Sequence, residues 1–130
     1  MPTALITRSS SASFEAVCSR LSEAAAKHKF GVLGTHDLKE KIQSKGVPFD
    51  RECRVFEVCN PQQAQIILNR NVEVAAALPC RISAYVDGGK TVLVTIEPSA
   101  LLGLFGDRSS DASEVAGEVR TSLIAIMDEA

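Results

Sequence analysis

Residues 82–96 contain the pattern that most restricts what this chain can fold into. Two runs in which apolar and polar side chains alternate, 82–86 and 91–96, flank the sequence Asp87-Gly88-Gly89-Lys90. A glycine-rich turn between two alternating runs is typical of a β-hairpin, because glycine readily adopts the backbone angles of tight hairpin turns. The strands of a hairpin are antiparallel, so the sheet that contains these residues is at least partly antiparallel.

Two amphipathic helices are predicted, one near each end of the chain. The first follows the run Ser9-Ser10-Ser11-Ala12-Ser13, which offers several residues suited to cap a helix. The second is expected to begin at Asp111-Ala112-Ser113-Glu114, which has the spacing of a capping box. Side chains three and four positions apart form one apolar stripe on each helix. The stripes consist of Phe14, Val17, Cys18, Leu21, Ala24, Ala25 and His28, and of Val115, Val119, Leu123, Ile126 and Met127.

The rest of the chain divides into short strands and helices. Strands are predicted over residues 3–8, 30–36 and 53–59, the last because its side chains alternate between two faces. Capping signals at Asp37 and at Asn60-Pro61 open helices that are expected to end near residue 44 and near residues 69–71. Residues 72–79 are predicted to be an extended connector, 98–105 a short helical turn and 107–113 a polar linker.

These elements predict an α+β fold with two layers, in which helices pack on one face of a largely antiparallel sheet. Residues 1–106 are expected to form the α+β core, and residues 107–130 a linker and a C-terminal helix that packs on the same domain. The direction of one strand pair stays open. The connection from Asp37 to Arg51 is long enough for a parallel crossover, but it also suits a helix across the end of an antiparallel pair.

The sheet face away from the helices is expected to retain large side chains. These are either Phe56, Tyr85 and Leu93 or the residues that alternate with them. Apolar surface of this kind marks an interaction site in many proteins. A second copy of the chain is therefore expected to cover part of this face, which predicts a homodimer.

The composition argues against several classes of partner. The chain has 14 basic and 16 acidic residues and no basic stripe with interleaved aromatic side chains, so nucleic acid is not an expected partner. The opening residues lack the charged start and long apolar middle of a secretion signal, and the apolar runs are too short for a membrane span. The chain is therefore expected to be cytoplasmic, without a membrane partner.

The cysteines do not form a metal-binding pattern. Cys18, Cys53, Cys59 and Cys80 show no Cys-x-x-Cys pair and no histidine at zinc-finger spacing, so neither a metal nor a cofactor is predicted. Cys53 and Cys59 share one face of a strand but lie roughly 20 Å apart, too far for a disulfide. Free thiols are expected in a reducing cytoplasm.

Cys59 and Asn60 form the first candidate site. The thiol immediately precedes the N-cap of a helix, where unpaired backbone N–H groups and the helix dipole favour negative charge. Such a thiol is expected to have a lowered pKa and to react as a thiolate. The alternative is that Cys59 packs against Ala64 as a small apolar residue.

Three neighbouring residues extend this candidate site. Cys80 begins the first hairpin strand, and its thiol either shares a cleft with Cys59 or packs in the core. Arg81 is suited to bind a carboxylate or phosphate or to keep a thiolate charged, although a single arginine at a strand start is usually solvated. Glu57 is interpreted as an exposed or paired charge at the rim.

His36 is the last candidate, because it too immediately precedes a capping signal. If strands 30–36 and 53–59 are parallel, His36 and Cys59 emerge at one sheet edge, where they are suited to act as nucleophile and base or as a soft-metal pair. If the strands are antiparallel, the two side chains lie at opposite ends and this site does not form.

Several short blocks resemble one known family. They are Phe30-Gly31-Val32-Leu33, the helix start at Asp37, Val58-Cys59-Asn60-Pro61 with Ala64, Leu78-Pro79-Cys80-Arg81, and Glu97-Pro98. Together they resemble the domain of unknown function 302, a bacterial and archaeal family, over about residues 14 to 100. The resemblance implies a compact α+β fold and dimers, and it supplies no catalytic residues. Many members have a glycine where this chain has Val74-Ala75-Ala76-Ala77, so close approach of a ligand there is expected to be reduced.

Two functions follow from these observations. The first is a non-catalytic homodimeric module that binds a small molecule or a protein partner near the start of the Asn60 helix, since no Ser-His-Asp order, paired carboxylates or dinucleotide fingerprint is present. The alternative is thiol-based sulfur or redox chemistry, or soft-metal handling, through Cys59 and Cys80. Whether the chain is an enzyme stays open at this point.

Overall fold

The computed structural model describes residues 4–106 and 109–130. Its elements, in chain order, are β1 (Leu5–Ser10), α1 (Phe14–Lys27), β2 (Gly31–Asp37), α2 (Leu38–Gln43), β3 (Cys53–Cys59), α3 (Pro61–Arg70), the 3₁₀ helix η1 (Val72–Ala77), β4 (Cys80–Asp87), β5 (Lys90–Ile96), α4 (Pro98–Gly103) and α5 (Ser110–Glu129). Within these described residues, no helix is both long and apolar enough to span a membrane.

The five strands form one sheet in the order β1-β5-β4-β3-β2, and every neighbouring pair is antiparallel. The predicted hairpin is confirmed as β4 and β5, which close with Asp87 opposite Lys90. Gly88 and Gly89 both have positive φ angles, +59° and +78°, in the turn between them. A residue with a side chain adopts such angles at a cost, so the two glycines fix this turn.

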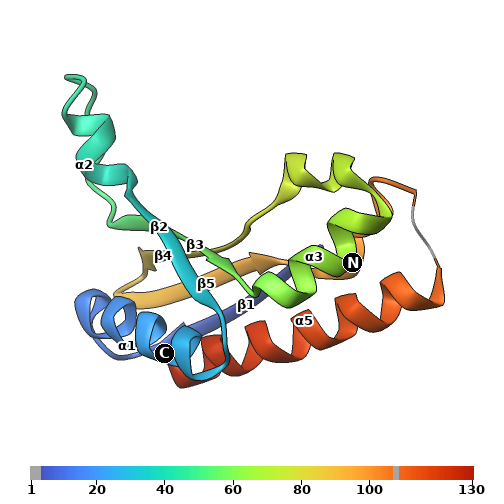
Figure 1. The fold of residues 1–130 in the computed structure, drawn as a ribbon. Coiled ribbons are helices and arrows are strands. Elements are labelled where there is room, and N and C mark those ends of the chain that lie inside the picture. The colour runs from blue at the N-terminus through green and yellow to red at the C-terminus, as the bar shows by residue number, and fades with distance from the viewer. Residues whose placement is uncertain (1–3, 107–108) are drawn as a thin grey trace.

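Helices α1 and α5 lie side by side and cover one face of the sheet (Figure 1). The fold is therefore the predicted two-layer α+β arrangement. Between the layers lies the main core, in which Phe30, Phe56, Val58, Ile82 and Leu93 from the strand layer pack against Val17, Leu21, Leu123 and Ile126 from the helices. Burying a large aliphatic or aromatic side chain contributes about 1.5–3 kcal/mol, so this interface dominates the stability.

A second apolar cluster lies where the shorter helices meet the first half of α5. It contains Ile67 of α3, Val74 of η1 and Leu102 of α4, together with Ala112, Val115 and Ala116 of α5. Val119 packs against both clusters, so the two are continuous along α5. This second cluster holds η1 and α4 close to the sheet end at which β4 begins.

The helix starts follow the predicted capping signals at Asp37 and Asn60, and Ser13 of the serine run caps α1. Asp37 accepts a hydrogen bond from the backbone N–H of Glu40 at 3.0 Å, and Asn60 accepts one from Gln63 at 3.1 Å. These bonds satisfy N–H groups that have no partner within the helix. Helix α2, which has no buried residue, projects past the end of the sheet (Figure 1).

The main differences from the sequence prediction lie in three places. Residues 72–77 form η1 instead of an extended connector, because Asn71 caps the turn by accepting from the N–H of Glu73. Helix α5 starts at Ser110, with Ser109 as its N-cap in place of Asp111. The first strand is Leu5–Ser10, and residue 3 of its predicted span, like residues 107 and 108 of the predicted linker, lies outside the described residues.

The sheet face opposite α1 and α5 is called the open face here. Three of its apolar side chains alternate along β5, namely Val92, Val94 and Ile96, and the register places Leu5, Tyr85 and Val55 on the same face. Phe56 and Leu93 point toward the helices and are buried, whereas Tyr85 does not. The prediction that these three large side chains share a face was therefore wrong.

Candidate functional site

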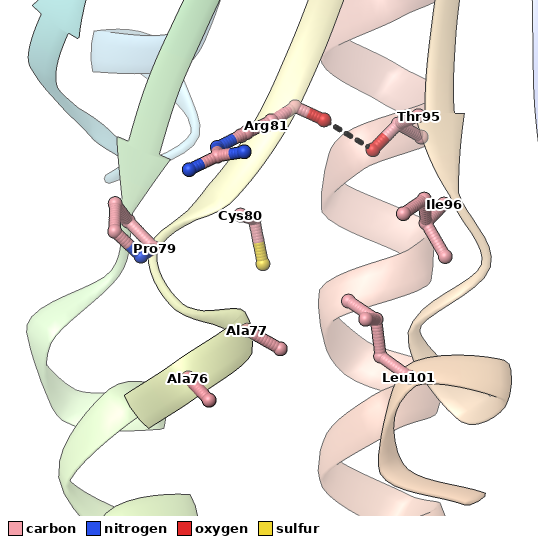
Figure 2. A pocket seen from close by; sticks show the side chains of 8 residues that line it. All are labelled: Ala76, Ala77, Pro79, Cys80, Arg81, Thr95, Ile96 and Leu101. Carbon is pink, nitrogen blue, oxygen red and sulfur yellow. Dashed lines mark hydrogen bonds between the residues drawn. The ribbon is translucent and has the colours of Figure 1, made fainter. Parts of the chain in front are cut away.

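A hollow lies at the beginning of β4, beside Cys80. It has a volume of about 220 Å³ and is called the Cys80 cavity here. Figure 2 shows the eight residues that line it, which are Ala76, Ala77, Pro79, Cys80, Arg81, Thr95, Ile96 and Leu101. They come from four consecutive parts of the fold: η1 and the segment after it, β4, β5 and α4.

The walls of the Cys80 cavity follow from the chain path around it. Leu78-Pro79, a cis peptide bond, turns the chain from η1 into β4. On the other side, β5 ends and Pro98 starts α4, which brings Leu101 across from Ala77 (Figure 2). The Thr95 hydroxyl donates a hydrogen bond to the Arg81 carbonyl at 2.7 Å and ties the two strands together at the cavity.

The cavity has an apolar interior and a charged rim. The Cys80 sulfur points between η1 and the end of β5 (Figure 2), and Thr95 beside it is buried. At the outside, Ile96 is 45% exposed and the Arg81 side chain is 66% exposed. Because Cys80 and Arg81 are consecutive in a strand, they point to opposite faces of the sheet. The cavity thus reaches from the core side of the sheet to its open face.

Cys80 also lines two smaller cavities. One, of about 40 Å³, lies at the start of α3 and is shared by Cys59, Asn60, Gln63 and Ala64. The other, of about 50 Å³, lies under Leu78 and is lined by apolar residues of the second cluster. A water molecule occupies about 30 Å³ of the liquid, so each of these spaces holds roughly one water. Of these three cavities, only the Cys80 cavity has a volume large enough for an organic ligand.

The two thiols therefore meet at one small cavity, but neither is activated. Burial raises the pKa of the Cys80 thiol to about 11, and burial also raises the pKa of Cys59. The prediction that the pKa of Cys59 is lowered was therefore wrong, because its pKa is raised. One N–H of the helix start next to it is already engaged, because the Asn60 side chain accepts the N–H of Gln63. Both groups are protonated thiols at neutral pH.

The predicted contact between His36 and Cys59 does not form, because β2 and β3 are antiparallel. His36 lies opposite Val55, whereas Cys59 lies opposite Gly31 at the other end of the pair. The sequence left open whether the two strands are parallel or antiparallel, and the antiparallel arrangement separates His36 from Cys59. Neither histidine of the described chain has a hydrogen bond to a cysteine.

His36 instead belongs to a row of charged groups on the open face. Its Nε2 lies 2.9 Å from Glu57 Oε1, and its Nδ1 lies 3.2 Å from the ammonium of Lys41. Arg81 Nε lies 3.7 Å from Glu57 Oε2, which completes the row from α2 to β4. Sequence reasoning missed this row because it depends on the antiparallel register, which places His36 and Glu57 on one face.

The row keeps Glu57 ionised. The His36 ring lies between the Lys41 ammonium and the Glu57 carboxylate, within hydrogen-bond distance of both. The hydrogen bond with His36 is the main reason why the pKa of Glu57 lies below its ordinary value, with smaller contributions from the charges of His36 and Arg81. Glu57 is therefore ionised and paired rather than a solvated rim charge.

The fold and the site together define a small two-layer α+β domain with a ligand-sized cavity beside a protonated thiol. Within residues 4–106 and 109–130, no three His, Cys, Asp or Glu side chains converge as metal ligands would.

Comparison with known proteins gives the family. A sequence profile described as "Domain of unknown function DUF302" matches residues 6–130, which is nearly the whole chain. The chain belongs to the DUF302 family, and the match extends beyond the blocks at residues 14 to 100. A solved structure described as uncharacterized conserved protein DUF302 from Bacillus stearothermophilus is similar, with 32% sequence identity and a TM-score of 0.92 over 98% of each chain. A search of curated proteins found no match.

Proposed function

We propose that this chain is a non-catalytic, homodimeric module that binds a small ligand in the Cys80 cavity. The observation that carries the proposal is the cavity itself, about 220 Å³ with mostly apolar walls and Arg81 at its rim. Pockets of this composition are typical of small-molecule sites. The space next to Asn60 measures only about 40 Å³, so the proposed ligand lies on the other side of Cys80 from the helix start.

The state of the thiols supports binding rather than covalent catalysis. A nucleophilic cysteine requires a base or a lowered pKa. Burial raises the pKa of both Cys59 and Cys80, and the His36 ring is engaged by Glu57 and Lys41. In the proposed module, Cys80 therefore acts as a small apolar wall residue.

The open face supports the dimer. Val92 and Val94 are partly exposed there, and Ile96 and Leu5 are 45% and 52% exposed. Contiguous apolar surface on a sheet is a typical feature of interfaces. The same face carries both charge signs in the row from Lys41 to Arg81, which suits a self-complementary contact. In this arrangement, the mouth of the Cys80 cavity lies near the interface.

Ligand binding is tested by NMR with a cavity-filling variant. Ala77→Leu places a larger side chain in the Cys80 cavity, and Ala75→Leu makes the same change on an exposed residue of η1 that lines none of the three cavities. Amide spectra are recorded during titration with a panel of small apolar acids, alcohols and amides. We expect saturable shifts at Thr95 and Ile96 in the wild type and in Ala75→Leu, and their loss in Ala77→Leu.

Two results would count against the proposal. One is that no compound of the panel shifts these amides at millimolar concentration. The other is that Ala77→Leu, with a wild-type spectrum elsewhere, responds as the wild type does, because the ligand would then bind outside the cavity.

The thiol function is the second candidate, since Cys59 and Cys80 line the same cavity of about 40 Å³. It requires at least one thiol that reacts rapidly at neutral pH. Iodoacetamide labelling of the native protein, followed by mass spectrometry, measures each rate separately. Burial of the two thiols leads us to expect labelling much slower than that of a free cysteine peptide. Rapid labelling of either residue would favour the thiol function over the binding module.

A further inference from the structure

Arg81 is the only charged residue among the eight that line the Cys80 cavity. The other seven supply methyl, ring and alkyl surface, one thiol and one hydroxyl that is already committed to the Arg81 carbonyl. A ligand that enters this space therefore meets apolar surface along most of its length and a cation at the mouth. That combination selects for an amphipathic molecule with one anionic end.

The guanidinium of Arg81 is available for a ligand. Its closest carboxylate atom is Glu57 Oε2 at 3.7 Å, which is beyond hydrogen-bond length, and the Arg81 side chain is 66% exposed. Exposed ion pairs of this kind are weak. The other oxygen of Glu57 is held by His36 at 2.9 Å, so Glu57 has a partner that remains when Arg81 turns away.

A carboxylate is an anion that suits a single exposed guanidinium. The planar fork of arginine matches the two carboxylate oxygens and forms paired, charge-assisted hydrogen bonds with them. The size of the apolar part is set by the cavity. A volume of about 220 Å³ equals roughly seven waters at about 30 Å³ each, which corresponds to a chain or ring of about six carbon atoms.

We propose that the ligand class is the small monocarboxylic acids. In this arrangement, the carboxylate pairs with Arg81 at the mouth, and a short hydrocarbon lies between η1 and α4 beside the Cys80 sulfur. The inference rests on the proposed function, because it assigns the ligand of that same cavity.

Figure 2 shows the guanidinium turned toward β3, the strand that carries Glu57. Binding therefore requires the Arg81 side chain to rotate from Glu57 to the cavity mouth. Glu57 competes with the ligand for the same cation, and its charge opposes an incoming carboxylate. Removal of that charge by Glu57→Gln should consequently tighten binding, whereas Arg81→Gln should weaken it. Opposite effects of two neighbouring substitutions are not expected from a general loss of structure.

The test is calorimetric titration of the full chain with hexanoate and with hexan-1-ol at pH 7, where hexanoate is ionised. Four proteins are compared: wild type, Arg81→Gln, Glu57→Gln and Arg20→Gln. Arg20 is an exposed arginine of α1 and serves as the matched control for loss of one positive charge. We expect hexanoate to bind the wild type several-fold more tightly than hexan-1-ol does.

In Arg81→Gln, this preference should disappear while hexan-1-ol binds as before. In Arg20→Gln it should persist, and in Glu57→Gln the affinity for hexanoate should rise several-fold. Circular dichroism of each variant verifies that it is folded.

The outcomes separate the two proposals. If hexan-1-ol and hexanoate bind the wild type equally and Arg81→Gln changes neither, the cavity binds apolar molecules but the carboxylate assignment is wrong. If neither compound binds and the NMR panel also gives no shifts, the proposed function fails together with this inference. If Arg20→Gln lowers hexanoate affinity as much as Arg81→Gln does, the effect is one of net charge and the assignment to Arg81 is overturned.

Discussion

At the residue scale, the open face depends on a position without a side chain. A Cβ atom added to Gly34 would lie 2.9 Å from Glu57 Oε1 and 3.6 Å from His36 Nε2. The φ angle of Gly34 is not in the left-handed region, so its role is to leave space rather than to make a turn. The glycine thus permits the hydrogen bond that keeps Glu57 ionised and in place.

Gly34→Ala should displace the Glu57 carboxylate, because the side-chain end moves more easily than the strand. We expect loss of the hydrogen bond from His36 and a rise in the pKa of Glu57 toward its ordinary value, with little change in the free energy of unfolding. Carbon-13 NMR titration of the Glu57 carboxyl measures this pKa. Gly31→Ala is the control, since the nearest atom to its added Cβ is 3.9 Å away. An unchanged Glu57 pKa in Gly34→Ala would contradict this role.

At the element scale, the short helices depend on their caps. The Asn60 side chain accepts the N–H of Gln63, and Pro61 at the first helical position needs no partner. Such local signals can be predicted from sequence because all of their atoms lie within four residues. The start of α5 could not be predicted in the same way, because Ser109, Ser110 and Asp111 are three consecutive residues that are all able to cap.

Asn60→Ala should lower the free energy of unfolding by about 1 kcal/mol, since one helix N–H loses its partner. Asn69→Ala, on an exposed position of the same helix, should change it by less than about 0.5 kcal/mol. Urea denaturation monitored by circular dichroism measures both values. Equal effects of the two substitutions would mean that the cap does not stabilise α3.

Ion pairs connect the C-terminal ends of helices α1 and α5. Glu129 at the end of α5 contacts His28 and lies 3.3 Å from Lys27, both at the end of α1. The hydrogen bond from His28 is the main cause that lowers the pKa of Glu129 below its ordinary value of 4.5. A lowered pKa means that the folded state holds the ionised form more favourably than the unfolded state does.

This pairing predicts a pH dependence. The stability that Glu129 contributes is fully present above pH 4.5 and is lost as the pH falls through its lower folded pKa. Glu129→Gln should therefore be less stable than the wild type at pH 7, and the two should converge in strong acid. Glu118→Gln, an exposed change on the same helix, should follow the wild-type curve. Thermal unfolding between pH 2 and pH 7 measures the difference. A gap that persists in strong acid would contradict this assignment.

At the scale of the whole molecule, the sheet has one face covered by helices and one that carries partly exposed apolar side chains. The alternation within the hairpin predicted its two strands and its turn, but it did not predict the faces, because Tyr85 lies opposite Val92 and not on the side of Leu93. Strand direction for β2 and β3 could not be predicted, because the loop between them has a length that suits either connection. The lining of the Cys80 cavity could likewise be predicted only in part. Cys80 and Arg81 stand out in the sequence, but Ala77, Ile96 and Leu101 reach the cavity only through packing of η1 and α4.

The open face provides the test of the dimer. Val94 lies at its centre, between Thr7 of β1 and Ser83 of β4. We expect the wild type to sediment at twice the 13.9 kDa monomer mass. Val94→Lys should sediment as a monomer, because a charge would be buried in the interface. Ser19→Lys, on the exposed side of α1, should remain dimeric. Analytical ultracentrifugation distinguishes these states, and a monomeric wild type would remove the dimer from the proposal.

A crystal structure with hexanoate shows whether the Cys80 cavity holds a ligand. We expect density for the five-carbon chain between η1 and the end of β5, with the carboxylate on the guanidinium of Arg81 rotated away from Glu57. A cavity that contains only water in crystals grown at saturating hexanoate, or hexanoate bound elsewhere on the protein, would contradict this expectation.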